Sequence, residues 1–123
     1  MQSPMFNFEK LDVWQKAIDF AELVYKHTRQ FPDDERFGLT NQMRRAAVSI
    51  SSNIAEGTAR MSQTDFARFI EIAPGSVFEV ISQAFVGRRE GFLDEADFRA
   101  IYKVAEEVGR MLSGLRKSLV EVT

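Results

Sequence analysis

Two adjacent arginines, Arg44 and Arg45, are the residues of this sequence best suited to binding chemistry. Arg45 is followed by Ser49, Ser52 and Glu56 at spacings of four, three and four residues. Residues at these spacings lie along one face of an α-helix. The segment is therefore predicted to present a polar strip that contains a cation at one end and a carboxylate at the other.

The strip has two interpretations, because the planar guanidinium group binds phosphate and carboxylate alike. In the first, it binds phosphate or a protein partner, and Arg60 and Arg68 add cations from nearby in the sequence. In the second, which we favour, the arginines pair with Glu56 or with another carboxylate across helices or subunits. Arg44, Arg45, Arg60 and Arg68 are kept as candidate nucleic-acid or partner-binding residues.

Two polar residues of the same segment, Asn53 and Glu56, are candidate structural residues. Asn53 lies at the edge of an apolar stripe, where it could contact a ligand. We favour a hydrogen bond within the protein that fixes the register of the helices, as buried amides do in coiled coils.

The residue types present give little support for a catalytic site or a metal site. His27 is the only histidine, no serine or cysteine motif accompanies it, and we interpret it as a surface residue at a helix end. A carboxylate-bridged di-metal site in a helical bundle needs a Glu-x-x-His motif on each of two helices, which one histidine cannot supply. We therefore predict no catalytic residue, no metal and no cofactor, and no enzymatic activity.

Four segments must position these residues, and all four carry the period of a helix. Apolar side chains recur at spacings of three and four, and no segment alternates with the two-residue period of a strand. The spacing predicts helices over about 11–29, 39–56, 63–89 and 95–119. Four such helices with short connections favour one all-α domain over 1–123, an antiparallel up-down-up-down four-helix bundle.

The ends of these helices carry recognisable signals. Ser62 is predicted to cap the third helix, with Asp65 three residues later, and Asp94 is predicted to cap the fourth. Gly57 is predicted to end the second helix as a left-handed C-terminal residue. Pro74 removes a backbone hydrogen bond and is predicted to kink the third helix, or to divide it into two shorter ones.

A second apolar seam is predicted on the third helix, where Phe78 and Phe85 lie about 100° from the main stripe. Large apolar patches are unfavourable on monomers, so we favour an oligomer interface over a small-molecule pocket. The second helix also carries small, uncharged side chains on its outer face, which suggests that both of its faces are buried. The candidate interface residues are Val48, Ser52, Ala55, Phe78 and Phe85.

Composition limits the possible partners. The 123 residues carry a formal net charge of -2, so total charge gives nucleic-acid binding no support unless the arginines cluster. There is no cysteine, which fits a reducing compartment. No run of about 20 consecutive apolar residues is present, and the first ten residues do not resemble a signal peptide. We therefore expect a cytoplasmic protein without a membrane partner.

Several runs of residues carry a resemblance to a known family. They are Phe8, Leu11, Val13 to Ala17, Phe31, Pro32, Phe37 to Leu39, Gln42, Arg44 to Ile50 and Ser52 to Gly57. The chain resembles the four-helix-bundle proteins called ribosomal RNA intervening-sequence proteins, from about Phe8 to Leu119. Ser51 stands where many members have proline, which implies a less bent second helix, and Pro74 stands where members usually have another residue.

The resemblance implies a ring-like homopentamer. It also implies distant kinship to the accessory protein of diversity-generating retroelements, which binds nucleic acid and a reverse transcriptase. It does not imply a known activity, because the function of the family is unassigned. We expect a non-enzymatic oligomeric binding or scaffold protein of unassigned cellular role, and the resemblance suggests RNA or a nucleic-acid-processing protein as its partner. The alternative is a purely structural or protein-interaction homo-oligomer.

The two hypotheses differ in what they predict for the arginines. Nucleic-acid binding predicts a solvent-facing cluster drawn from Arg44, Arg45, Arg60, Arg68, Arg88 and Arg89. A purely structural role predicts that the same arginines are paired with acids such as Glu56, Glu71 and Glu79.

Overall fold

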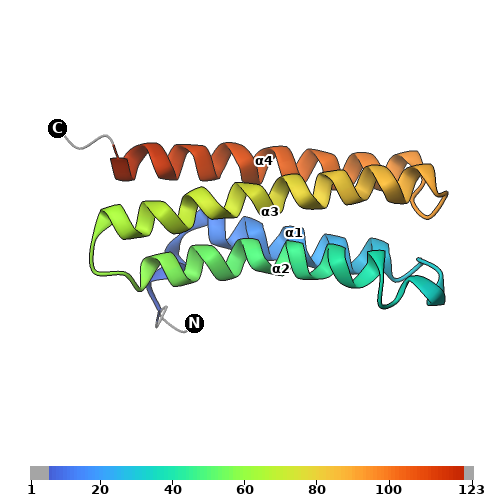
Figure 1. Ribbon diagram of the computed structural model, residues 1–123. Helices are drawn as coiled ribbons and strands as arrows, with labels where there is room; N and C mark the ends of the chain where they lie inside the picture. The colour runs from blue at the N-terminus through green and yellow to red at the C-terminus, as the bar shows by residue number, and fades with distance from the viewer. Residues whose placement is uncertain (1–5, 121–123) are drawn as a thin grey trace, which may run out of the picture.

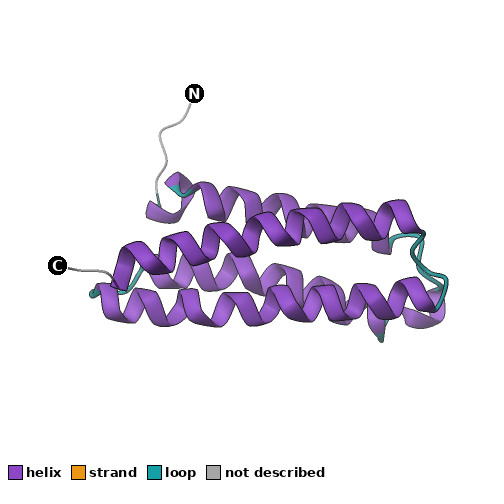
Figure 2. Cartoon of the chain, turned by 90° about the horizontal axis from the view of Figure 1, so that it is seen from above, coloured by secondary structure: helices purple, strands orange, loops and turns teal. Residues whose placement is uncertain are grey.

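The computed structural model describes residues 6–120, which form four long helices and two short ones. They are η1 (Asn7–Lys10), α1 (Asp12–Thr28), η2 (Asp33–Glu35), α2 (Leu39–Thr58), α3 (Gln63–Arg89) and α4 (Glu95–Val120). The four α-helices lie side by side and alternate in direction (Figure 1). Loops occur only at the two ends of the described bundle (Figure 2). Each helix packs on the next in the chain and α1 packs on α4, so the predicted antiparallel four-helix bundle is confirmed.

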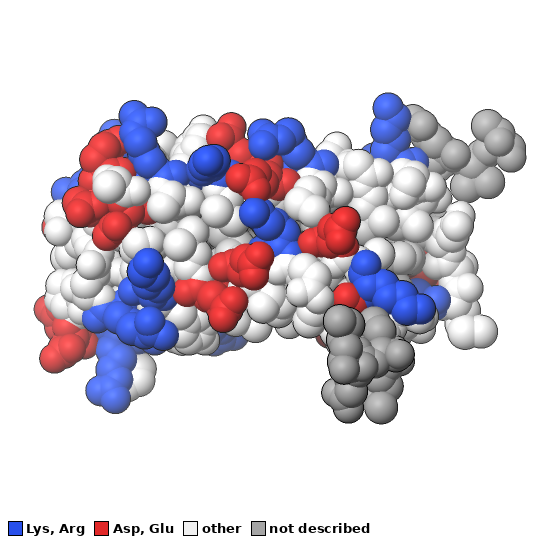
Figure 3. Space-filling view, turned by 180° about the vertical axis from the view of Figure 1, so that it is seen from behind, with Lys and Arg blue, Asp and Glu red and all other residues white. Residues whose placement is uncertain are grey.

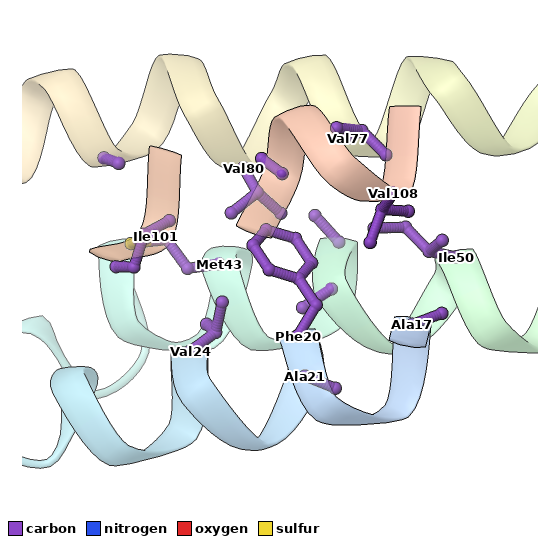
Figure 4. Close-up of a cluster of buried hydrophobic side chains, with 14 of the residues drawn as sticks. Ala17, Phe20, Ala21, Val24, Met43, Ile50, Val77, Val80, Ile101 and Val108 are labelled. Carbon is purple, nitrogen blue, oxygen red and sulfur yellow. The ribbon is translucent and has the colours of Figure 1, made fainter. Parts of the chain in front are cut away.

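The core lies along the axis of the bundle and receives side chains from all four helices. Phe20 of α1 is fully buried and points inward between Met43 and Ile50 of α2 and Val80 of α3 (Figure 4). Ile101 and Val108 of α4 belong to the same cluster. Each large apolar side chain buried in this way stabilises the fold by about 1.5–3 kcal/mol relative to an exposed one.

The predicted caps of α3 and α4 are confirmed. The Asp65 backbone N–H donates to Ser62 Oγ at 3.1 Å, and the Asp97 backbone N–H donates to Asp94 Oδ1 at 2.8 Å. Both bonds satisfy a backbone donor that has no partner within the first turn of a helix.

The predicted role of Gly57 was wrong. Helix α2 continues through Gly57 to Thr58, and Gly91 is the one residue with positive φ among those described. A Cβ atom added to Gly57 would lie 2.7 Å from Phe66 Cδ1 and 3.1 Å from Phe69 Cβ. Glycine stands here because α3 approaches the backbone of α2 too closely for a side chain.

Helix α3 runs without interruption through Pro74 from Gln63 to Arg89, so the alternative of two shorter helices was wrong. The expectation that both faces of α2 are buried is not met within one chain, and burial by a second copy stays a prediction. Ser51, on the side of α2 that faces α1, is buried, but Val48 is 41% exposed and Ser52 is exposed as well.

The prediction of a surface histidine was wrong too. His27 is buried at the contact between α1 and α4, with Nδ1 3.4 Å from Asp97 Oδ1. The same carboxylate accepts a hydrogen bond from Gln30 Nε2 at 2.8 Å. The first turn of α4 covers His27, and local sequence around α1 gives no sign of that contact.

Ion pairs at the surface connect α1 with α4 and α3 with α4. Lys16 Nζ of α1 lies 2.8 Å from Glu107 Oε2 of α4. The hydrogen bond from Lys16 lowers the pKa of Glu107, and the bond to Glu107 raises the pKa of Lys16. Arg116 of α4 pairs with Glu71 of α3 at 2.8 Å.

One helix of the described chain, α3, is long and apolar enough to cross a membrane, judged by length and composition alone. The sequence expectation considered only uninterrupted apolar runs, whereas α3 includes scattered polar residues. One such helix is weak evidence for a membrane protein, and α3 also supplies Ile70, Val77 and Val80 to the core.

Candidate functional site

Two surfaces on different sides of the bundle carry the candidate residues. The first, which we call the α3–α4 groove, lies between the outer sides of those helices and includes a hollow of about 570 Å³. Its lining is mostly apolar and comprises Pro74, Val77, Phe78, Ile81, Tyr102, Ala105, Glu106, Gly109, Arg110, Leu112 and Ser113. Phe78 stands at its edge with 75% of its surface exposed.

A second hollow of about 390 Å³ adjoins the first along α4. Tyr102 and Glu106 line both hollows, so we treat the two as one groove. Phe85 lies in this second part and contacts Phe98, with ring centroids 4.8 Å apart. The guanidinium of Arg88 lies 4.0 Å from the Phe98 ring centroid and forms an ion pair with Glu95 at 3.2 Å. Arg88 therefore stabilises this end of the bundle.

The second surface, which we call the cationic groove, runs from α1 across to α2 and is formed by Tyr25, Lys26, Arg29, Arg44 and Arg45. Tyr25 lines two adjacent hollows, one with Lys26 and Arg29 and the other with Arg44 and Arg45. Asn41, Val48, Ser49 and Ser52 complete the second hollow.

Arg44 is held in place by two contacts to α1. Its Nε donates to Thr28 Oγ1 at 2.9 Å, and its guanidinium carbon lies 4.6 Å from the centroid of the Tyr25 ring. Thr28 Oγ1 in turn lies 2.7 Å from the Val24 carbonyl oxygen, to which it donates. The position of the Arg44 side chain is thus fixed before any ligand binds.

The structure does not bring all four predicted arginines together. Arg60 follows α2 about 20 Å along the helix direction from Arg45, and its guanidinium lies 4.4 Å from the Phe69 ring centroid. Arg68 pairs with Asp65 on α3 at 3.6 Å. The cations that join Arg44 and Arg45 are instead those of α1, which sequence reasoning missed.

Lys26 and Arg29 are three residues apart near the end of α1, where both are exposed and line one hollow with Tyr25. Their spacing alone showed that they share a helix face. Their proximity to Arg44 depends on how α1 packs against α2, and no pattern in the sequence reports it.

The other polar candidates act locally. Asn53 Nδ2 donates to the Ser49 carbonyl at 2.8 Å within α2, and no hydrogen bond of its side chain to another helix occurs in residues 6–120. Ser49 makes the contact between helices, with its Oγ 2.6 Å from Ser76 Oγ of α3. Glu56 is exposed and has no ion-pair partner within the described chain.

The remaining interface candidates lie on α2, where Val48 and Ser52 also line the second hollow of the cationic groove. Val48 and Ser52 are exposed and Ala55 is half-buried. In the described part of the chain, these residues share no hollow with Phe78 and Phe85, so their role in an interface stays a prediction.

Basic and acidic side chains are interspersed over much of the face in Figure 3. Lys and Arg gather at the lower left of that view, toward the end of the bundle where the α1–α2 connection lies (Figure 3). In residues 6–120, no group of three or more histidine or acidic side chains is arranged to hold a metal ion.

Comparison with known proteins gives a solved structure and a family. No curated protein matches the chain. A crystal structure of a protein of unknown function from the S23 ribosomal protein family of Bacteroides thetaiotaomicron is 23% identical and has a TM-score of 0.77. The match covers 85% of this chain and 95% of that one, and it shows a shared fold. The family described as 23S rRNA-intervening sequence protein matches residues 9–114, and the chain therefore belongs to that family.

Proposed function

We propose that this protein is a non-enzymatic, cytoplasmic binding protein that works as a homo-oligomer, and that α3 carries the contact between subunits. The observation that carries the proposal is the exposure of apolar side chains on α3. Phe78 is 75% exposed, Ile72 is 55% exposed and Val86 is 48% exposed. In the most apolar 18-residue window of α3, only 28% is buried inside the chain.

A second copy of the chain accounts for this surface better than a membrane does. Helix α3 packs between α2 and α4, and removing it into a bilayer would expose the apolar faces of both neighbours. Large apolar side chains exposed in this number on one helix of a soluble domain mark an interaction site. The family resemblance gives five as the proposed number of subunits.

The partner of the assembly is proposed to be RNA or a nucleic-acid-processing protein, as the resemblance implies. Arg44 and Arg45 favour this over a purely structural oligomer, because neither has a carboxylate partner among the described residues. Glu71, one of the acids expected to pair with them, is bound by Arg116 instead.

Size-exclusion chromatography with light scattering tests the proposed assembly. One chain has a mass of 14.0 kDa, and we expect the unchanged protein to have five times the mass of one chain. Phe78→Glu should lose the assembly, because a charge would be buried without a partner.

Met61→Glu is the matched control, since Met61 is fully exposed and lies in the α2–α3 connection, away from the α3–α4 groove. It should keep the mass of the unchanged protein. If the unchanged protein has the mass of a single chain at micromolar concentration, the oligomer is refuted, and Phe78 would then be interpreted as the edge of a ligand pocket.

A further inference from the structure

The cationic groove is locally positive in a chain whose net charge is -2. Its two hollows contain four cations, Lys26, Arg29, Arg44 and Arg45, and a single acid, Glu22. A third hollow, which shares Arg45 with the groove, adds Glu79. The cations therefore outnumber the acids by two over the three hollows, which concentrates positive potential on one side of the bundle.

These cations are available to a ligand. Within residues 6–120, none of the four forms an ion pair with a carboxylate. By contrast, Arg68, Arg88, Arg99 and Arg116 are all paired with acids. The four paired arginines lie on α3 and α4, whereas no cation of the groove is paired with an acid among the described residues.

Arg44 is also oriented in advance. Its Nε bond to Thr28 and its position over Tyr25 use one donor and one face of the guanidinium. Its terminal amino groups have no hydrogen bond to another residue of the described chain. A planar fork that is already ordered loses less conformational entropy when it binds phosphate, which raises the affinity.

The shape of the groove fits an extended charged strand better than a folded protein. The cations come from two helices and are spread along the groove instead of surrounding one point. Protein interfaces depend on a central aromatic or apolar anchor, and the main aromatic ring here, Tyr25, is covered on one face by Arg44. Neutral donors continue the groove at Asn41 and Ser52, and such side chains commonly bind phosphate oxygens.

We infer that the cationic groove binds the phosphodiester backbone of a single-stranded nucleic acid, with Lys26, Arg29, Arg44 and Arg45 as the phosphate-binding residues. The inference deepens the proposed binding role, on which it rests, by naming its surface and its ligand class. It does not depend on self-assembly. It also excludes Arg60 and Arg68, which lie at the other end of α2 and at the start of α3.

Fluorescence anisotropy with a labelled 20-nucleotide RNA, and with DNA of the same sequence, tests the inference. The variants are Arg44→Gln, Arg45→Gln and the double substitution Lys26→Gln with Arg29→Gln. The matched controls are Arg60→Gln and Arg68→Gln, which remove the same charge outside the groove. Circular dichroism and light scattering on every variant separate loss of binding from loss of folding or assembly.

We expect binding that weakens steeply with salt, because bound phosphates release counterions. Arg44→Gln and Arg45→Gln should each weaken binding about threefold in 100 mM salt and reduce the slope of log K against log salt by about 0.7. The double substitution removes two charges and should reduce the slope by about twice that amount. The controls should bind as the unchanged protein does. RNA and DNA should bind with similar affinity, because the backbone and not the base is recognised.

Two results would overturn the inference. One is the absence of RNA and DNA binding at 50 mM salt by the folded, unchanged protein. The other is an equal loss of affinity in Arg60→Gln and Arg68→Gln, which would show that total charge matters and the groove does not. A monomeric protein that still binds through the groove would refute the oligomer and leave this inference in place.

Discussion

At the scale of single residues, Gly57 sets how closely α2 and α3 approach each other. The ring of Phe66 and the Cβ of Phe69 occupy the space that a side chain at this position would need. The same pair of helices includes the contact between Ser49 and Ser76, whose hydroxyl oxygens lie 2.6 Å apart. Small residues on α2 thus bring its backbone against α3, and bulk at position 57 would separate the two helices.

Gly57→Ala should therefore lower the free energy of unfolding by about 1–2 kcal/mol, since overpacking exceeds the gain in helix propensity. Gly114→Ala is the control, because a Cβ there meets no atom within 4 Å and α4 is helical on both sides. It should raise the free energy of unfolding by about 0.5–1 kcal/mol. Urea denaturation measures both, and a stabilising Gly57→Ala would contradict the close approach.

At the scale of elements, α3 combines two roles that usually belong to different helices. One side supplies Ile70, Val77 and Val80 to the core, and the other exposes Phe78 and Phe85. Pro74 lies between these faces and lines the α3–α4 groove. Because proline has no backbone N–H, the Ile70 carbonyl lacks its usual helical partner at this point.

Pro74→Ala restores that hydrogen bond and should raise the free energy of unfolding of the chain by about 1–3 kcal/mol. Gly75→Ala serves as the comparison, because it improves helix propensity by about 1 kcal/mol without changing the hydrogen bonds. A thermal unfolding series compares the two variants. If Pro74→Ala is no more stable than Gly75→Ala, then α3 has already adapted to the proline and its shape there is unstrained.

At the scale of the whole molecule, the proposed assembly couples stability to concentration. Association of folded subunits stabilises them by mass action, so Tm should rise with protein concentration. Over a hundredfold range we expect a clear rise for the unchanged protein and for Met61→Glu. Phe78→Glu should show a constant Tm, because its subunits cannot associate. A Tm independent of concentration in all three proteins would argue against assembly through α3.

The helices themselves were predictable from sequence because their causes are local. The four predicted segments match α1 to α4 to within about two residues at each end. The period of apolar residues and the cap residues Ser62 and Asp94 act within a few residues of their own position. The exposed seam of Phe78 and Phe85 was equally visible, because it follows from the angle between residues on one helix.

Only the tertiary structure determines which side chains of different helices contact each other. Arg44 lies beside Tyr25 and Thr28 because α1 and α2 run antiparallel in one particular register and rotation. His27 is buried for a similar reason, since α4 returns across the end of α1. The separation of Arg60 from Arg45, by contrast, follows from the length of α2 alone.

The sequence by itself therefore determined the four helices, their amphipathic faces and the family to which the chain belongs. The tertiary structure determined the cationic groove, the burial of His27 and the role of Gly57. The physical reason is that amphipathic periodicity fixes which face of each helix turns inward, whereas the axial offset between helices depends on the packing of all core side chains at once.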